Sequence, residues 1–251
     1  MACDNKANGI YDPEKPGNYP ADSIRWINDM ANDFADIWTK EEDGGQWFHD
    51  AERGINWADV HNTDASQKGR VEVFRQWVIF QGEDIVHTIK GKFTMDEIAS
   101  GQENQGGWVM QTMAWNITNL AGNREYKPLI VARIRANQVD YLVYDFEWNP
   151  ARQRFTSKPG FPVSKVLETG PQAGKTHEIT LQIKFSRTET GFVRATLNGE
   201  RIHEADYNGV TYPFAIPYMN QRIFWKAGCY ASYEGIHYGR IGIHYLATDV
   251  P

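Results

Sequence analysis

The segment Gln221–Ser232, QRIFWKAGCYAS, decides the fold that we expect for this chain. In an extended strand, successive side chains point to opposite faces. One face is then apolar and consists of Ile223, Trp225, Ala227, Cys229 and Ala231. The other face consists of Arg222, Phe224, Lys226, Gly228, Tyr230 and Ser232. Two cations and a phenol opposite an apolar face predict that this strand forms the floor of a polar groove.

Period-two alternation continues along most of the chain from about residue 46. The other segments that we expect as strands are 70–80, 108–116, 129–136, 141–148, 178–186, 192–197 and 238–246. Asn198-Gly199 is the strongest hairpin signal between them. Many strands of one composition predict an all-β fold, a jelly-roll sandwich of two antiparallel sheets with a concave groove. We expect one domain over residues 22–251.

The N-terminal part has a different character. Residues 1–21 are polar and proline-containing, which predicts a flexible lead. After a cap at Asp22-Ser23, apolar residues recur every three or four positions up to Trp38, which predicts a short helix. The residues around Cys3 resemble a bacterial lipoprotein cleavage site, and a polar tail without function is the alternative. The first interpretation predicts a secreted, periplasmic or lipid-anchored protein.

Composition and charge exclude several classes of protein. A net charge of −6 argues against a nucleic-acid surface, and no apolar run is long enough for a membrane span. Aromatic residues make up 13% of the chain, which is typical of sugar-binding proteins and of aromatic-rich β cores alike. The two cysteines, Cys3 and Cys229, lie in such different contexts that we expect no disulfide. We expect a monomer.

The sequence offers little for metal or cofactor chemistry. The seven histidines lack the spacing of a metal site, and no acidic loop resembles a dedicated calcium motif. We therefore expect no metal in the site and no cofactor, with a structural calcium ion in a loop as the alternative. Asp145 and Glu147 share a strand face about 7 Å apart, so a glycoside hydrolase is an alternative function.

Three expected strands carry the polar groups that a reaction on an anionic sugar needs. Arg70 and Glu72 share a face of GRVEVFRQ, and Gln111 and Trp115 share a face of VMQTMAW. FWKAGCY, which contains Lys226, resembles the YFKAGxY strand of the alginate lyase and glucuronan lyase jelly-roll superfamily. Arg70-Val71-Glu72 is similar to the Arg-x-Glu of that superfamily, and Gln111 falls where its Gln-Ile-His strand begins. Order and spacing agree over residues 70–232.

This resemblance implies a polysaccharide lyase that cleaves a uronic-acid polymer by β-elimination. Arg70 and Gln111 would neutralise the uronate carboxylate, so that the C5 proton becomes acidic. Tyr230 would protonate the leaving glycosidic oxygen and, in a syn elimination, also remove the C5 proton. The predicted substrate-binding residues are Lys226, Arg222, Glu72, Trp115 and His49.

One departure from the superfamily concerns the catalytic base. The histidine of the Gln-Ile-His strand is replaced by Met113. Either Tyr230 acts alone, or a histidine from the loop-like segment before Arg70 serves as the base, for which we favour His61 over His49. Glucuronan, alginate and ulvan-like polymers remain open as substrates, and an open groove predicts endo-acting cleavage. A non-catalytic carbohydrate-binding module on the same sandwich is the alternative from another class.

Overall fold

The computed structural model describes residues 39–43, 45–50, 52–62, 69–79, 86–97, 105–118, 124–144, 146–152, 154–184, 191–207, 221–230 and 237–248. In these residues the protein is all-β, without a helix, and its strands form two seven-stranded antiparallel sheets and a two-stranded ribbon. The expected jelly-roll sandwich is thus confirmed. The expected lead and N-terminal helix lie outside the described residues. No helix in the described part is long and apolar enough to cross a membrane.

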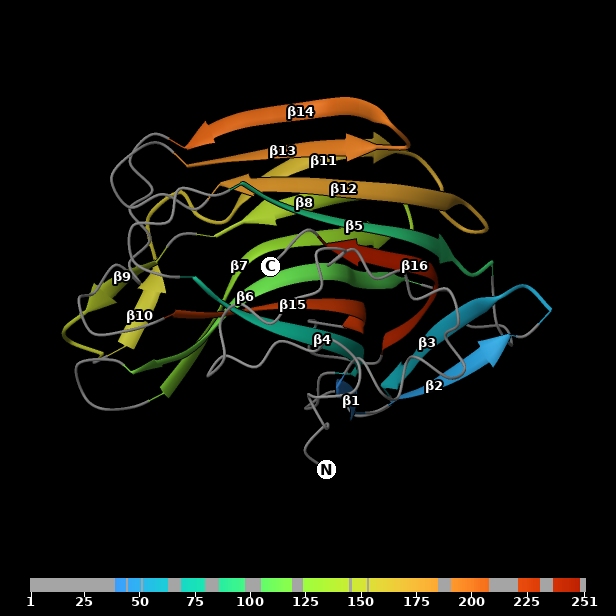
Figure 1. The fold of residues 1–251 in the computed structure, drawn as a ribbon, viewed down its shortest axis with the longest axis horizontal. Helices are drawn as coiled ribbons and strands as arrows, with labels where there is room; N and C mark the ends of the chain where they lie inside the picture. Colours follow the sequence, from blue (N-terminus) through green and yellow to red (C-terminus); the bar gives the residue numbers. More distant parts are fainter. Residues whose placement is uncertain are drawn as a thin grey trace.

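The two sheets lie face to face, with the ribbon at one end of the sandwich and β2 and β3 at the other (Figure 1). The first sheet has, in spatial order, β1 (Thr39–Asp43), β4 (Arg70–Ile79), β15 (Gln221–Tyr230), β6 (Gly106–Thr118), β7 (Arg124–Arg135), β8 (Gln138–Val143) and β11 (Val163–Thr169). The second has β14 (Glu200–Tyr207), β13 (Gly191–Leu197), β12 (Thr176–Lys184), β5 (Val86–Met95), β16 (His237–Thr248), β3 (Ile55–Asn62) and β2 (Gly45–Asp50). The ribbon pairs β9 (Phe146–Asn149) with β10 (Arg154–Ser157).

Strand β15 lies inside the first sheet and is hydrogen-bonded to β4 on one side and to β6 on the other. Trp225, Ala227 and Cys229 are fully buried in the core between the sheets. The apolar face read from the sequence is confirmed at these three positions. Because side chains alternate along the strand, Lys226 and Tyr230 point to the outer face of the sheet. Burial raises the pKa of the Cys229 thiol.

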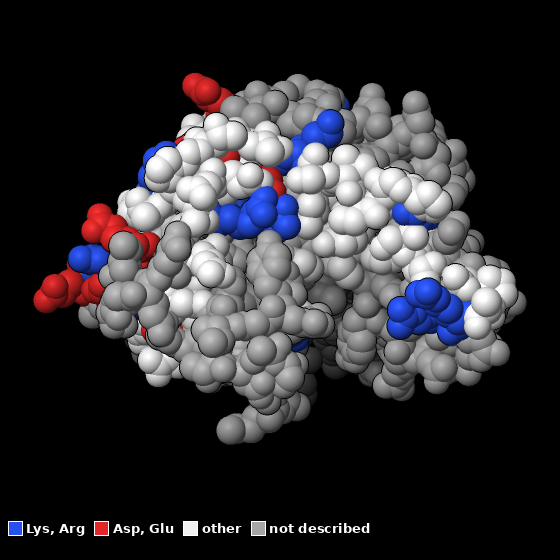
Figure 2. Space-filling view, turned by 180° about the vertical axis from the view of Figure 1, so that it is seen from behind, with Lys and Arg blue, Asp and Glu red and all other residues white. Residues whose placement is uncertain are grey.

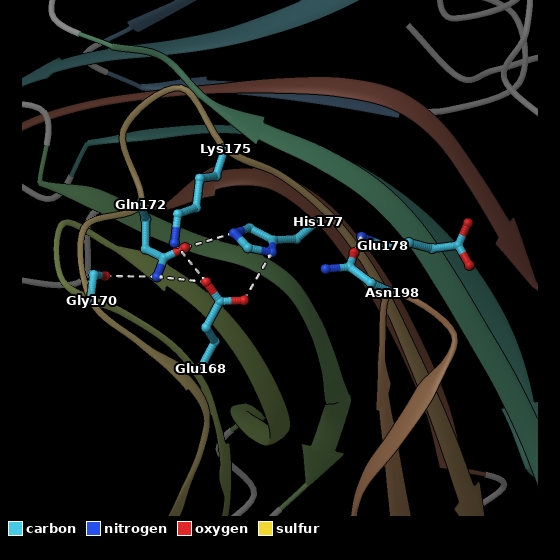
Figure 3. Close-up of polar contacts among 7 residues, drawn as sticks. All are labelled: Glu168, Gly170, Gln172, Lys175, His177, Glu178 and Asn198. Carbon is cyan, nitrogen blue, oxygen red and sulfur yellow. Dashed lines mark hydrogen bonds and ion pairs between the residues drawn. The ribbon is translucent and has the colours of Figure 1, made fainter.

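The hairpin expected at Asn198-Gly199 is also present, between β13 and β14. Both turn residues have positive φ, 53° at Asn198 and 86° at Gly199, as a tight two-residue hairpin turn requires. Asn198 also ties this turn to the neighbouring strand β12. The side-chain Oδ1 of Asn198 accepts a hydrogen bond from the backbone N–H of Glu178 over 2.8 Å (Figure 3). The backbone N–H of Asn198 donates to the backbone carbonyl of Glu178, also over 2.8 Å.

The segment 141–148, expected as one strand, is divided into two. Strand β8 ends at Val143, where the Tyr144 amide turns to the Leu129 carbonyl at 2.8 Å. From Phe146 the chain leaves the first sheet and pairs with β10. Residues 39–43, which follow the segment expected as a helix and were not expected as a strand, form the edge strand β1, because they pair with β4 along their whole length.

A buried polar network fixes the connection from β11 in the first sheet to β12 in the second (Figure 3). Gln172 Nε2 donates to the Gly170 carbonyl over 2.7 Å, which leaves its Oε1 to accept from His177 Nε2 over 2.6 Å. The second ring nitrogen of His177 is buried and lies 3.8 Å from a Glu168 oxygen, and Lys175 pairs with the same carboxylate at 2.8 Å. The imidazole is thus held between the Gln172 amide and the Glu168 carboxylate.

Burial of His177 predicts that acid weakens the fold. Burial lowers the pKa of His177 below its ordinary value of 6.5, although Glu168 alone would raise it. Below pH 6.5 the unfolded chain therefore binds the proton first, and the free energy of unfolding falls as pH decreases. Each unit by which the pKa is lowered contributes about 1.4 kcal/mol of this loss.

Urea unfolding near neutral pH and again at mildly acid pH measures this loss. In the variant His177→Gln, whose amide can still donate to Gln172, the loss between the two pH values should be smaller. An equal loss in both proteins would show that His177 does not carry the acid dependence.

Candidate active site

Arg70 and Gln111 converge on the carboxylate of Glu72. Gln111 Nε2 donates to Glu72 Oε1, and Arg70 Nε lies 3.3 Å from Glu72 Oε2. Glu72 and Gln111 are each about 1% exposed, whereas the Arg70 side chain is 31% exposed. Residues from β4 and β6, on either side of β15, are thus linked over the outer face of the first sheet. The Glu72 carboxylate therefore orients the Arg70 and Gln111 side chains, which are donors of the kind that bind a carboxylate.

Gly228 is the residue of β15 over which this link forms, because it lies opposite Glu72 in the register. Its φ is +152°, a value that side-chain-bearing residues rarely adopt, and the register between β15 and β6 shifts at this point. A Cβ at this position would lie 2.1 Å from the Val71 carbonyl oxygen and 2.8 Å from the Glu72 Cα. Glycine therefore lets β15 approach β4 beneath the polar cluster.

Tyr230 lies next to this cluster, opposite Arg70 in the register. The Arg70 guanidinium carbon is 4.6 Å from the centroid of the Tyr230 ring. On the other side, Trp108 of β6 meets the same ring edge to face, with centroids 5.0 Å apart and planes at 86°. The phenol ring is held between a cation and an indole, and only 9% of Tyr230 is exposed.

Lys226 lies on the same face, opposite Gln111 in the register. It is 7% exposed, so it is not an ordinary surface lysine. A largely enclosed lysine next to Gln111 thus adds a basic side chain to the site. On the side of the molecule opposite to that of Figure 1, described basic side chains form several separate groups, whereas acidic ones gather mainly at the left margin (Figure 2). On this face, the described acidic side chains therefore lie apart from most of the basic ones.

The structure brings together Arg70, Glu72, Gln111, Lys226 and Tyr230 from three adjacent strands.

For the remaining predicted site residues, the structure gives the position in a strand but does not describe the side chain. Arg222 and Trp115 lie opposite each other in β15 and β6, and their side chains lie outside the described residues. His49 and His61 lie in β2 and β3 of the second sheet and not in a loop, because both segments pair with neighbouring strands. Their side chains are also outside the described part, and the role of each as base or ligand remains a prediction.

Trp108 is a site residue that was not expected from the sequence. Its place follows from the register, since a bulge in β15 between Ala227 and Tyr230 sets Trp108 opposite Tyr230, and a bulge cannot be located from alternation. Within the described residues, no group of three or more His, Cys, Asp or Glu side chains could hold a metal ion.

The fold that carries this cluster is similar to the folds of solved glucuronan and alginate lyases. The chain is similar in structure to an endo-β-1,4-glucuronan lyase from the fungus Trichoderma reesei, with a TM-score of 0.63 and 17% identity over 86% of this chain and 91% of that one. It is also similar to alginate lyase A1-II′ of polysaccharide lyase family 7, with a TM-score of 0.53 and 18% identity over 81% and 82% of the chains.

A third similar structure is the alginate lyase PA1167 from Pseudomonas aeruginosa, with a TM-score of 0.53 and 14% identity over 82% and 86% of the chains. No family model matches the sequence, and no curated protein matches it. At these identities the likeness establishes the fold. The resemblance read from FWKAGCY is therefore confirmed at the level of architecture.

Replacing Gly228 should disturb the site through the backbone. In Gly228→Ala the new methyl group meets the backbone of β4, so we expect a loss of about 2–4 kcal/mol in the free energy of unfolding. Gly160→Ala is the matched control, because Gly160 also has positive φ, +83°, but a Cβ there has no neighbour within 4 Å. That variant should lose only about 1 kcal/mol. Equal losses in urea unfolding would contradict the steric explanation.

Proposed function

We propose that the protein is a polysaccharide lyase that cleaves a uronic-acid polymer by β-elimination. The observation that carries the proposal is the convergence of Arg70 and Gln111 on a carboxylate beside Tyr230, on a fold shared with glucuronan and alginate lyases. A uronate carboxylate is the group that must be neutralised before its C5 proton can be removed. The donors for it, and a phenol for proton transfer, lie on one face.

Glu72 is a positioning residue in this proposal. Its buried carboxylate holds the Arg70 guanidinium and the Gln111 amide in place before the substrate arrives. Donors fixed in advance stabilise the charge that develops in the transition state without a cost of reorganisation. The second hydrogen of the Gln111 amide and the exposed part of Arg70 then bind the carboxylate of the sugar.

The chemical step moves one proton and one electron pair. A base removes the C5 proton, the C4–C5 double bond forms, and the C4–O4 glycosidic bond breaks. Tyr230 donates a proton to the departing O4. In a syn elimination the same side chain, as phenolate, removes the C5 proton and becomes the phenol that protonates O4. Tyr230 is then a phenolate again at the end of the cycle. A histidine base, His61 or His49, is the alternative.

The remaining features of the proposal concern the substrate and its location. Lys226 and Arg222 attract the anionic chain, with Trp115 as a further contact. We propose glucuronan-, alginate- or ulvan-like polymers as the substrate and endo-acting cleavage by a monomer. Since such polymers occur outside cells, we propose that the protein acts there, released or anchored through Cys3, which lies outside the described residues.

Incubation with polyglucuronate, alginate and ulvan tests the proposal. The ultraviolet absorbance of the new C4–C5 double bond should rise on at least one of them. Binding without any rise would show a carbohydrate-binding module instead. New reducing ends without this absorbance would show a glycoside hydrolase.

Tyr230→Phe should lower kcat by about 10³-fold, because general acid–base catalysis typically contributes 10²- to 10⁴-fold. Binding of uronate oligosaccharides should persist, since the ring still packs between Arg70 and Trp108. Tyr245→Phe is the control, because this tyrosine belongs to the second sheet, where its hydroxyl contacts Glu178. A Tyr230→Phe variant with wild-type kcat would remove Tyr230 from the mechanism.

A further inference from the structure

The hairpin of β7 and β8 carries a second polar cluster, centred on the fully buried carboxylate of Asp140. Arg133 binds it through two nitrogens, Nε at 2.7 Å from Oδ1 and Nη2 at 2.5 Å from Oδ2. Arg135 Nη2 and Gln138 Nε2 donate to the same Oδ2, at 2.9 and 2.6 Å. One carboxylate thus accepts four hydrogen bonds from three side chains.

Two guanidinium groups of this cluster share one carboxylate. Arg133 alone makes a bidentate pair that neutralises Asp140, so Arg135 adds a second positive charge. Within the described part of the chain, Asp140 is the only acid in contact with Arg135, and one carboxylate cannot neutralise two guanidinium groups. The Arg133 side chain is 12% exposed and the Arg135 side chain 33%. Arg135 is therefore the more accessible of the two arginines.

The cluster lies on the same face of the first sheet as the proposed active site. Ala132 and Ile134 point into the core, so Arg133 and Arg135, which alternate with them, point to the outer face. Register pairs connect the two sites in one row across five strands, through Arg70, Tyr230, Trp108, Arg133 and Asp140.

The spacing between Tyr230 and the two arginines matches a ligand longer than one sugar. Tyr230 and Arg133 are two strands apart, which is about 10 Å, and Arg135 lies about 7 Å further along β7. The Trp108 indole, which contacts the Tyr230 ring, lies between them. A chain molecule that crosses the sheet at Tyr230 can therefore reach the arginines, whereas a single sugar cannot.

We propose that Arg133 and Arg135 form a second subsite, which binds a sugar carboxylate several residues away from the bond that is cleaved. The proposal rests on the proposed function. A guanidinium presents parallel N–H donors that match the two oxygens of a carboxylate. Asp140 holds both arginines in place, so that little side-chain freedom is lost on binding. The subsite selects for long anionic chains.

Arg135→Gln tests the subsite, since Arg133 still neutralises Asp140 in this variant. With a long uronate polymer, KM should rise roughly tenfold at unchanged kcat, the loss expected for one charged hydrogen-bonded contact. With the shortest oligosaccharide that the wild type cleaves, KM should stay the same. Arg194→Gln, the same charge change on β13 of the second sheet, should leave both values at the wild-type level.

Two results would overturn the subsite: an unchanged KM on the long polymer, or an equal rise of KM on long and short substrates with a lower Tm, which indicates a structural role. If Arg135→Gln does not fold, Arg135→Lys replaces it. That variant keeps the charge but loses the planar donor pair, so a smaller rise of KM on the polymer alone is expected, and no rise overturns the proposal.

Failure of the proposed function gives a different result, because the wild type then forms no unsaturated product. In that case calorimetric titration with long uronate oligosaccharides decides. Weaker binding to Arg135→Gln than to the wild type and to Arg194→Gln supports the subsite without catalysis. Equal binding by all three proteins, or none by the wild type, overturns it.

Discussion

The pairing of β15 with two neighbours at once is the constraint on which the site depends. Ten consecutive residues of β15 are in register with β4, and most of them also with β6. This pairing determines that residues distant in sequence, such as Arg70, Gln111 and Tyr230, share one face. A shift of one residue would turn Trp225 outward and bury Lys226 in the core, so the apolar face fixes the register of the polar one.

The site is also unusual for an outer face of a sheet, because its polar groups are buried. Glu72 and Gln111 have nearly no exposed surface, and Lys226 and Tyr230 have less than a tenth. Burial makes an unpaired carboxylate costly, and the Arg70 and Gln111 side chains offset that cost. The same pairing holds both donors in a fixed orientation, so that folding stability and preorganisation of the site have one physical origin.

The two faces of β15 could be predicted from the sequence because one of them is apolar throughout, and the jelly-roll class could be predicted because many other segments also alternate. Segments with mixed composition gave no such signal. In β3 all residues from Ile55 to Val60 are buried, including Asn56 and Asp59, so no alternation marks the strand. His61 was expected in a loop because the segment before Arg70 is rich in Gly, Asn and Asp. The Asp140 cluster was missed because it depends on the register of β7 and β8, which fixes Asp140 opposite Arg133.

Cys229 and Tyr230 are consecutive in β15 and lie on opposite sides of the first sheet. The thiol is fully enclosed, and its Sγ lies 3.9 Å from the Gly106 carbonyl oxygen. Since thiolate is the reactive form and burial suppresses it, a modifying reagent reaches Cys229 only when the sheet opens locally. The rate at which Cys229 is labelled therefore depends on how often β15, the strand that carries Tyr230, opens. This rate measures the local stability of that strand.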